Sequence, residues 1–160
     1  MASKTKVAVV FGSRSVEHEV SIVTAMQVFE NINREKYEVI PVYIDKTGRW
    51  LIDDKLQKIE NFKNLKLGVK ALEYVFEASP SGKALTPKSA FNFFKKIKAD
   101  IYFPLIHGTY GEDGTIQGMF EMADAPYVGS GVTGSATGMD KIIQKSVFKD
   151  NGIPVVKYLW

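Results

Sequence analysis

Cysteine is absent from this sequence, which excludes a disulfide framework, a thiolate metal site and a cysteine nucleophile. Histidine is scarce as well: His18 and His107 are the only two, so a histidine-built metal centre is close to excluded. Long apolar runs are also missing. The first, residues 7–11, is far shorter than the roughly 18 residues that span a bilayer, and it is too short for a signal peptide. We therefore expect a cytoplasmic protein with no membrane partner.

The charge is nearly balanced, and there is no long basic run. Lysine and arginine number 21 against 18 acidic residues, which gives a net charge of +3, and the excess is scattered along the chain. This distribution argues against nucleic acid as a partner. The length of 160 residues and the apolar share of 45% are typical of a globular protein with one compact core.

The first 45 residues predict a strand, a helix and a second strand. Residues 6–11 form a β-branched apolar run that stops at Gly12, the pattern of a parallel strand buried on both faces. A helix is expected to begin near Val16, with Ser15 as its N-cap. Its apolar residues recur on one stripe: Ile22, Ala25, Met26, Phe29 and Ile32. The second strand is expected at residues 37–44.

The rest of the chain returns to the same alternation after a less regular stretch from residue 45 to 87. The pattern there predicts short strands at 50–52 and 72–77. Further on we expect a helix at 88–98, a buried strand at 100–106, a helix from 114, a short strand at 127–128, a small-residue segment at 129–138 and a helix at 140–151 ended by Gly152. The fold class is therefore α/β: an open, mostly parallel sheet with helices on both faces.

The first candidate site is the segment from Gly12 to Glu19, where the first strand ends and the helix begins. Ligands bind at such positions in parallel sheets because backbone N–H groups and the helix dipole converge there. The segment has only one glycine, so it is not the G-x-G-x-x-G dinucleotide fingerprint. Two ordinary interpretations stay open: Glu17 and Glu19 as acids that favour the first helical turn, and His18 as a surface histidine.

The second candidate site is the segment from His107 to Gly114, which follows the predicted strand at 100–106. It contains three glycines among eight residues, together with one imidazole and the carboxylates of Glu112 and Asp113. Such a density of glycine points to unusual backbone angles or to a ligand close to the backbone. The alternative is a loop in which Asp113 caps the next helix and His107 simply ends a strand. Because both candidate segments follow buried parallel strands, they should lie at one edge of the sheet.

A third feature is a row of lysines, Lys141, Lys145 and Lys149, spaced four residues apart on the last predicted helix. Such a row is usually a solvated helix face, although a lysine can also bind a phosphate. The preceding glycines and serines allow either close packing or a ligand near the backbone. Neither a Ser-His-Asp motif nor a Walker phosphate loop is present.

Four motifs, taken in order, resemble the D-alanine–D-alanine ligase family of the ATP-grasp superfamily. They are residues 12–21, residues 107–118, residues 126–131, and Met139-Asp140-Lys141 continuing to residues 152–154. The resemblance covers nearly the whole chain except about residues 45–98. One departure is Ser13, where the family usually has a second glycine.

The resemblance implies a Rossmann-like pre-ATP-grasp domain at residues 1–138 and the beginning of an ATP-grasp domain at 139–160. It implies ATP-dependent joining of two D-alanines through an acyl phosphate, for peptidoglycan precursors, with ATP and Mg²⁺ as cofactors. The full-length enzyme is expected to be a homodimer. This chain is expected to be inactive alone, because most of the ATP and magnesium ligands would lie in later domains. The second substrate stays open between D-alanine, D-lactate and D-serine.

Roles for individual residues follow from their motif positions. The resemblance implies that Glu17 holds the ammonium of the first D-alanine and that Ser21 helps to bind it. His107 would lie beside the developing negative charge, with Glu112 orienting its ring. Lys141 would reach the ATP phosphates. Two rival functions are a stand-alone module that binds a small anion and a dimerisation module. The affinity and the oligomeric state of the chain alone would distinguish them.

Overall fold

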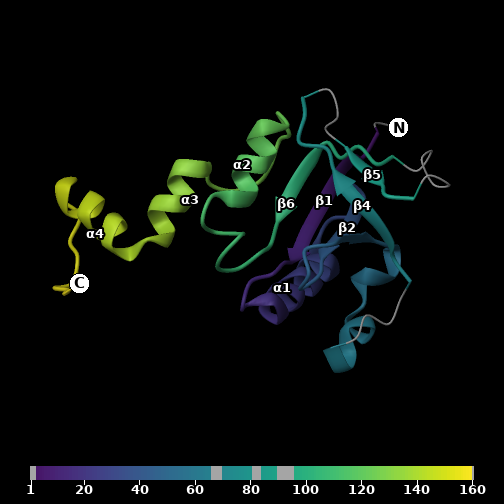
Figure 1. Ribbon diagram of the computed structural model, residues 1–160, viewed down its shortest axis with the longest axis horizontal. Helices are drawn as coiled ribbons and strands as arrows, with labels where there is room; N and C mark the ends of the chain where they lie inside the picture. Colours follow the sequence, from purple (N-terminus) through teal and green to yellow (C-terminus); the bar gives the residue numbers. More distant parts are fainter. Residues whose placement is uncertain (1–2, 66–69, 81–83, 90–95, 160) are drawn as a thin grey trace.

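The computed structural model describes residues 3–65, 70–80, 84–89 and 96–159, and Figure 1 shows its architecture. The strands are β1 (Thr5–Gly12), β2 (Tyr37–Ile44), β3 (Trp50–Ile52), β4 (Leu72–Phe76), β5 (Leu85–Pro87) and β6 (Ile101–Pro104). The helices are α1 (His18–Asn31), α2 (Thr115–Met122), α3 (Val132–Met139) and α4 (Lys141–Asp150), and two 3₁₀ segments are η1 (Asp54–Gln57) and η2 (Ile59–Leu65).

The strands form one sheet in the order β5-β4-β3-β2-β1-β6. The interior strand β1 pairs in parallel with β2 and with β6, and Val7 lies opposite Val39 on one side and Ile101 on the other. Its residues 7–12 are all buried, which confirms the strand predicted from the apolar run. Strands β3, β4 and β5 extend the sheet in antiparallel pairs, so the α/β sheet is mixed. The connection from β2 to β3 is too short for a crossover helix, which requires an antiparallel pair there.

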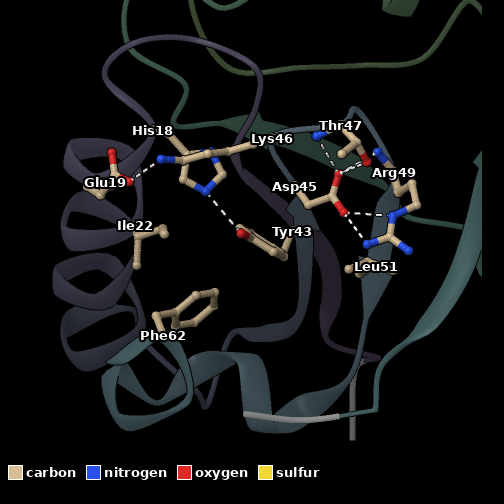
Figure 2. Close-up of a pocket in the computed structure, with 10 residues that line it drawn as sticks. All are labelled: His18, Glu19, Ile22, Tyr43, Asp45, Lys46, Thr47, Arg49, Leu51 and Phe62. Atoms are coloured by element: carbon tan, nitrogen blue, oxygen red, sulfur yellow. Dashed lines mark hydrogen bonds and ion pairs between the residues drawn. The ribbon is translucent and has the colours of Figure 1, made fainter. Parts of the chain in front are cut away.

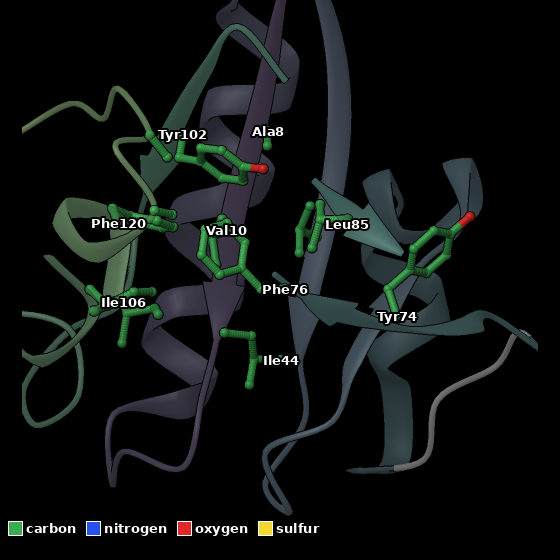
Figure 3. Close-up of a cluster of buried hydrophobic side chains, with 13 residues drawn as sticks. Ala8, Val10, Ile44, Tyr74, Phe76, Leu85, Tyr102, Ile106 and Phe120 are labelled. Carbon is green, nitrogen blue, oxygen red and sulfur yellow. The ribbon is translucent and has the colours of Figure 1, made fainter. Parts of the chain in front are cut away.

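Helices cover both faces of the sheet, as the sequence predicts. On one face α1 packs Ile22, Ala25, Met26 and Phe29 against β1 and β2, and Phe62 joins this cluster (Figure 2). On the other face Phe120 of α2 stacks on Tyr102, with ring centroids 4.9 Å apart (Figure 3). These two apolar layers hold the strand ends, and therefore the loops after them, in fixed positions.

After residue 131 the chain leaves the sheet, and α3 and α4 extend away from it (Figure 1). Neither helix has a buried residue. Helix α4 begins and ends close to its predicted bounds: Asp140 caps it by accepting from the N–H groups of Ile142 and Ile143, and Gly152 has the expected positive φ of 71°. Helix α3 was not expected, because its glycines, serine and threonines are weak helix formers.

Three details differ from the sequence-based expectations. Helix α1 begins at His18, and Ser15 is not its N-cap; the Ser15 hydroxyl instead accepts from the N–H of Glu17 at 3.1 Å. The helix predicted at 88–98 falls largely on residues 90–95, which lie outside the described residues. Its far end is not helical, because Ile97 forms an antiparallel bridge with Leu85. The short strand expected at 127–128 is a single parallel bridge between Tyr127 and Tyr102.

The hydroxyl of Tyr102 is buried without a hydrogen-bond partner among the described residues, and burial raises the pKa of Tyr102 to about 12. We expect Tyr102→Phe to raise the free energy of unfolding by about 1 kcal/mol near pH 7, because it removes an unsatisfied buried group. In the unfolded chain tyrosine titrates near pH 10. The protein should therefore lose stability as the pH rises from about 10 to 12, and the variant should lose less.

Urea unfolding of the parent chain and the variant at neutral pH and at several pH values above 10 measures both effects. Tyr37→Phe is the matched control, because Tyr37 is 36% exposed and its hydroxyl is not confined in the core. A destabilised Tyr102→Phe variant at neutral pH would show that the hydroxyl has a partner in the folded protein.

Candidate functional site

The loops after β1 and β6 meet because these strands are parallel neighbours, and Ser21 of α1 ties them together. The Ser21 hydroxyl accepts from the N–H of Gly12 at 2.8 Å and donates to the carbonyl of Leu105 at 2.6 Å. Ser21 is 0% exposed, so its hydroxyl is occupied inside the protein. The direct ligand contact that the resemblance implies for Ser21 does not fit this geometry. The residue links the two strand ends instead.

Glu17 lies where the two loops touch. It is exposed at the start of α1, and its Oε2 atom is only 2.9 Å from the position that a Cβ would occupy at Gly108. Gly108 has a positive φ of 69°, which also favours glycine. The carboxylate of Glu17 therefore lies against the backbone next to His107, and the two candidate segments form one site as expected.

Thr24, which lies on α1, fixes the imidazole of His107. The Thr24 hydroxyl donates to the carbonyl of Val20 at 3.1 Å, so it accepts from the Nε2–H of His107, which lies 2.9 Å away. The other ring nitrogen, Nδ1, has no hydrogen-bond partner in the described part of the chain. Thr24 follows Glu17 by seven residues, which places both on one face of α1. The helical spacing could have identified Thr24 from the sequence.

The resemblance implies that Glu112 orients the ring of His107, but the hydrogen bond that the structure shows for Glu112 goes to the neighbouring backbone. Its Oε2 atom accepts from the N–H of Gly108 at 2.9 Å and so holds the loop closed. Asp113 accepts from the N–H groups of Tyr110 and Thr115 at 2.8 and 3.0 Å. Burial favours a higher pKa for Asp113, but hydrogen bonds from Thr115 and Tyr110 outweigh it and lower the pKa. Both acids therefore stabilise the loop. The bond from the N–H of Thr115, at the start of α2, agrees with the alternative in which Asp113 caps that helix.

A groove of about 440 Å³ runs from His107 to Lys141 and is bordered by Glu112, Thr24 and the small-residue segment that includes Gly129 and Ser130. Lys141 is exposed, and its Nζ atom donates to the carbonyl of Gly138 at 2.9 Å. The other two lysines of the row do not line the groove, and Lys145 lies over the ring of Tyr158. The small side chains leave this space open, so the second candidate segment, the small-residue segment and Lys141 meet along one groove.

Gln117 also lines the groove and was not singled out in the sequence. It is 6% exposed, and its Nε2 atom donates to the carbonyl of Gly111 at 2.7 Å. Its Oε1 atom is buried and has no partner among the described residues. Its position in the second motif was visible, but a buried glutamine cannot be told from an exposed one by residue type alone.

The first loop is anchored from β2. Gly12 has a φ of 92°, and a Cβ there would come within 2.3 Å of the carbonyl oxygen of Ile44. Ser13 has a φ of 81°, and its N–H donates to the same carbonyl at 2.6 Å.

His18 is 3% exposed, which shows that the interpretation of His18 as a surface histidine was wrong. Its Nδ1–H donates to the carbonyl of Ser13, so its Nε2 accepts from the hydroxyl of Tyr43 at 2.9 Å.

Tyr43 keeps its proton in this network, since burial, together with the charges of Asp45 and Glu19, raises its pKa to about 12. It therefore remains a donor to His18 at neutral pH. Glu19 is exposed in the first turn of α1, as the macrodipole interpretation predicts, and it pairs with Lys46 at 2.5 Å. The hydrogen bonds among Ser13, His18 and Tyr43 hold the loop that precedes Glu17, and none of these three residues lines the groove.

Replacing Ser13 with glycine should stabilise the protein. A left-handed backbone costs an L-residue roughly 1–2 kcal/mol, whereas glycine adopts it freely. The extra freedom of glycine in the unfolded chain offsets part of this gain, so we expect Ser13→Gly to raise the free energy of unfolding by about 0.5–1 kcal/mol. Urea unfolding measures it. Ser15 lies two residues away and has no positive φ, so Ser15→Gly should lower the free energy of unfolding.

In the described part of the chain, no group of three or more histidine, aspartate or glutamate side chains could hold a metal ion. A search of the same residues for a helix of sufficient length and hydrophobicity to cross a membrane also finds none.

Comparison with known proteins gives a consistent result. The family model of the D-Ala–D-Ala ligase N-terminus matches residues 6–130. A D-alanine–D-alanine ligase from Ruminiclostridium cellulolyticum is 44% identical over 163 aligned positions, which cover 98% of this chain and 43% of the relative. The chain thus spans less than half the length of that relative.

Solved structures agree with the sequence comparison. The VanG D-Ala:D-Ser ligase from Enterococcus faecalis superposes with a TM-score of 0.81 at 36% identity, over 97% of this chain and 44% of that one. A D-alanine–D-alanine ligase from Bacillus anthracis in complex with ATP superposes with a TM-score of 0.61 at 26% identity, over 99% of this chain and 38% of that one.

Proposed function

Because this chain belongs to the D-alanine–D-alanine ligase family, through its amino-terminal domain, we propose that it contributes half of the active site of an enzyme that joins two D-alanines with ATP, for peptidoglycan precursors. One observation carries the proposal: the carboxylate of Glu17 lies against Gly108, the residue next to His107, and His107 itself lines a groove that reaches Lys141. A zwitterionic substrate needs an anion for its ammonium group and a donor for its developing negative charge, and this site offers both.

In the proposed reaction the carboxylate of the first D-alanine takes the terminal phosphoryl group of ATP, and ADP is released. The second D-alanine loses a proton from its ammonium group, its amine attacks the acyl carbon, and phosphate leaves. Glu17 holds the first ammonium group in place. His107 keeps its Nε2–H on Thr24, so a second proton on Nδ1 would face the groove and donate to the tetrahedral oxyanion. Fixing the ring through Thr24 avoids reorganisation during the reaction.

The nucleotide would extend along the groove toward Lys141. The ammonium of Lys141 already sits among the small residues that precede α4, where a phosphate could approach the backbone closely. Magnesium would neutralise the phosphate charge, with its ligands supplied by the part of the enzyme that this chain does not contain. We place the domain boundary at residue 138, so that residues 139–160 begin the ATP-grasp domain. The end of the family match at residue 130 supports this division.

The test is phosphate release from ATP that depends on D-alanine, in a full-length ligase that carries this chain as its amino-terminal part. We expect D-alanine-dependent turnover with Mg²⁺, and no ligation or ATP hydrolysis by the 160-residue chain alone. Assays with D-lactate and D-serine as second substrates would establish the specificity. Robust ligation by the short chain would overturn the proposed division between the domains.

A dimerisation module is the second candidate, because α4 exposes apolar side chains to solvent, including Ile142, Ile143 and Val147. In the ligase these would be covered by the rest of the enzyme, and we propose that the full-length enzyme is a homodimer. Light scattering at several concentrations distinguishes the candidates. The ligase proposal expects the short chain to be monomeric at micromolar concentrations, and a stable dimer of the short chain would favour the module.

A further inference from the structure

A second cavity, of about 380 Å³, lies on the other side of α1 from the proposed active site. It opens between the first turns of α1, the end of β2 and the turn into β3 (Figure 2). His18 and Ile22 face this cavity, whereas Glu17 and Thr24 lie on a different stripe of the helix. None of the groups proposed for ligation lines it, so it is a separate site.

The cavity has a polar end and an apolar end. Figure 2 shows the charged side chains gathered along one side, with Ile22 and Phe62 on the other and Leu51 near Arg49. Ile22 and Leu51 are each 7% exposed, which makes the apolar wall part of the packed core. Its volume lies within the range of about 300–1,000 Å³ that is usual for small-molecule sites. An occupant would therefore need an apolar body and one polar end.

The two acids at the polar end are already engaged. Asp45 accepts from the backbone and hydroxyl of Thr47 and from the backbone and guanidinium of Arg49. Burial favours a higher pKa for Asp45, but these hydrogen bonds lower it, so the carboxylate stays charged and paired. Glu19 accepts from Lys46, whose hydrogen bond lowers the pKa of Glu19.

The two cations, by contrast, keep free donors. Lys46 uses one of its three N–H bonds on Glu19, and Arg49 uses only Nε and Nη2 on Asp45. Nη1 of Arg49 has no partner among the described residues. Both cationic side chains are more than half exposed, at 58% and 56%, so an incoming group can reach them. The polar end therefore offers free cationic donors, which is what an incoming anion needs.

We propose that this cavity binds a small amphipathic carboxylate, with an aromatic or branched apolar body. The carboxylate accepts from Lys46 and Arg49, and the body packs on Ile22, Leu51 and Phe62. The site is independent of the proposed ligation activity, because it needs no group of the active-site groove and no part of a longer enzyme.

The experiment is a ¹H–¹⁵N NMR titration of the 160-residue chain with phenylacetate. A ligand with so few atoms should bind with a dissociation constant on the order of 1 mM. We expect saturable shifts at Ile22, Leu51 and Phe62, with the amides at the His107 groove unmoved. Phenylacetamide, which lacks the charge, should bind at least about tenfold more weakly, a loss comparable to that of one charge-assisted hydrogen bond. Phenethylamine should not bind.

Lys46→Gln is the informative variant, and Lys88→Gln is its matched control. Lys88 forms a similar exposed pair, with Glu73 at 2.7 Å, but its side chain does not line the cavity. Lys46→Gln should weaken phenylacetate binding several-fold without changing the fold of the chain, whereas Lys88→Gln should bind like the parent. Three outcomes overturn the proposal: no saturable shifts at the cavity, equal binding of phenylacetate and phenylacetamide, or equal effects of the two lysine variants.

Discussion

Glu17→Gln in the full-length ligase is expected to lower the rate of D-alanine-dependent phosphate release by about a hundredfold, the usual cost of losing a group that positions a substrate. Glutamine keeps the size of the side chain but removes the charge that would hold the ammonium of D-alanine. His107→Ala should cause a loss of the same order, because it removes the donor for the oxyanion. Steady-state phosphate release measures both effects.

Glu19→Gln is the control for the first variant. Glu19 is an exposed acid in the same helical turn, but it pairs with Lys46 on the side away from the groove. We expect it to keep near-normal turnover. Thermal unfolding of each variant separates lost chemistry from lost folding. Near-normal turnover of both Glu17→Gln and His107→Ala would show that neither residue acts in the reaction. Glu17 would then be an acid that favours the first helical turn, and His107 would simply end a strand.

Gly12→Ala is expected to lower the free energy of unfolding by about 3 kcal/mol, a large value for a single substitution. The new Cβ would lie 2.3 Å from the carbonyl oxygen of Ile44 and 2.8 Å from the ring of Tyr43. The backbone of β2 cannot yield without disturbing its pairing with β1. A positive φ of 92° adds strain of roughly 1–2 kcal/mol. For a domain of this size the melting temperature should fall by about 10 °C.

Gly152→Ala separates the steric clash of a new Cβ from the strain of a positive φ. Gly152 also has a positive φ, of 71°, but nothing lies within 4 Å of the position of its Cβ. Gly152→Ala should therefore lower the free energy of unfolding only by the cost of the backbone strain, about 1 kcal/mol. Urea unfolding of the two variants gives the difference. Equal losses at both positions would mean that β2 yields to the new methyl group, and that the close approach of Ile44 does not confine the first loop.

The amino-acid sequence determined the elements whose signal is local. The apolar run at residues 7–11 has the composition of a strand buried on both faces, and the structure places it inside the sheet, between β2 and β6. The apolar stripe of α1 has the period of a helix that packs on one face, and it does so. Two segments that follow predicted buried strands, one of them rich in glycine, predicted two loops at one edge, and the loops meet there. Period and composition are properties of a few neighbouring residues.

Only the tertiary structure decided which polar groups meet. Ser21 reaches a carbonyl 84 positions away, and His107 reaches a hydroxyl 83 positions away. His18 is buried because Tyr43 and Ser13 satisfy both of its ring nitrogens. A polar side chain can be buried once its hydrogen bonds are made, and its partners depend on how distant segments pack rather than on residue type. The sequence therefore contained the strands, the first helix and the two loops, whereas the role of each polar residue within them became visible only in the folded chain.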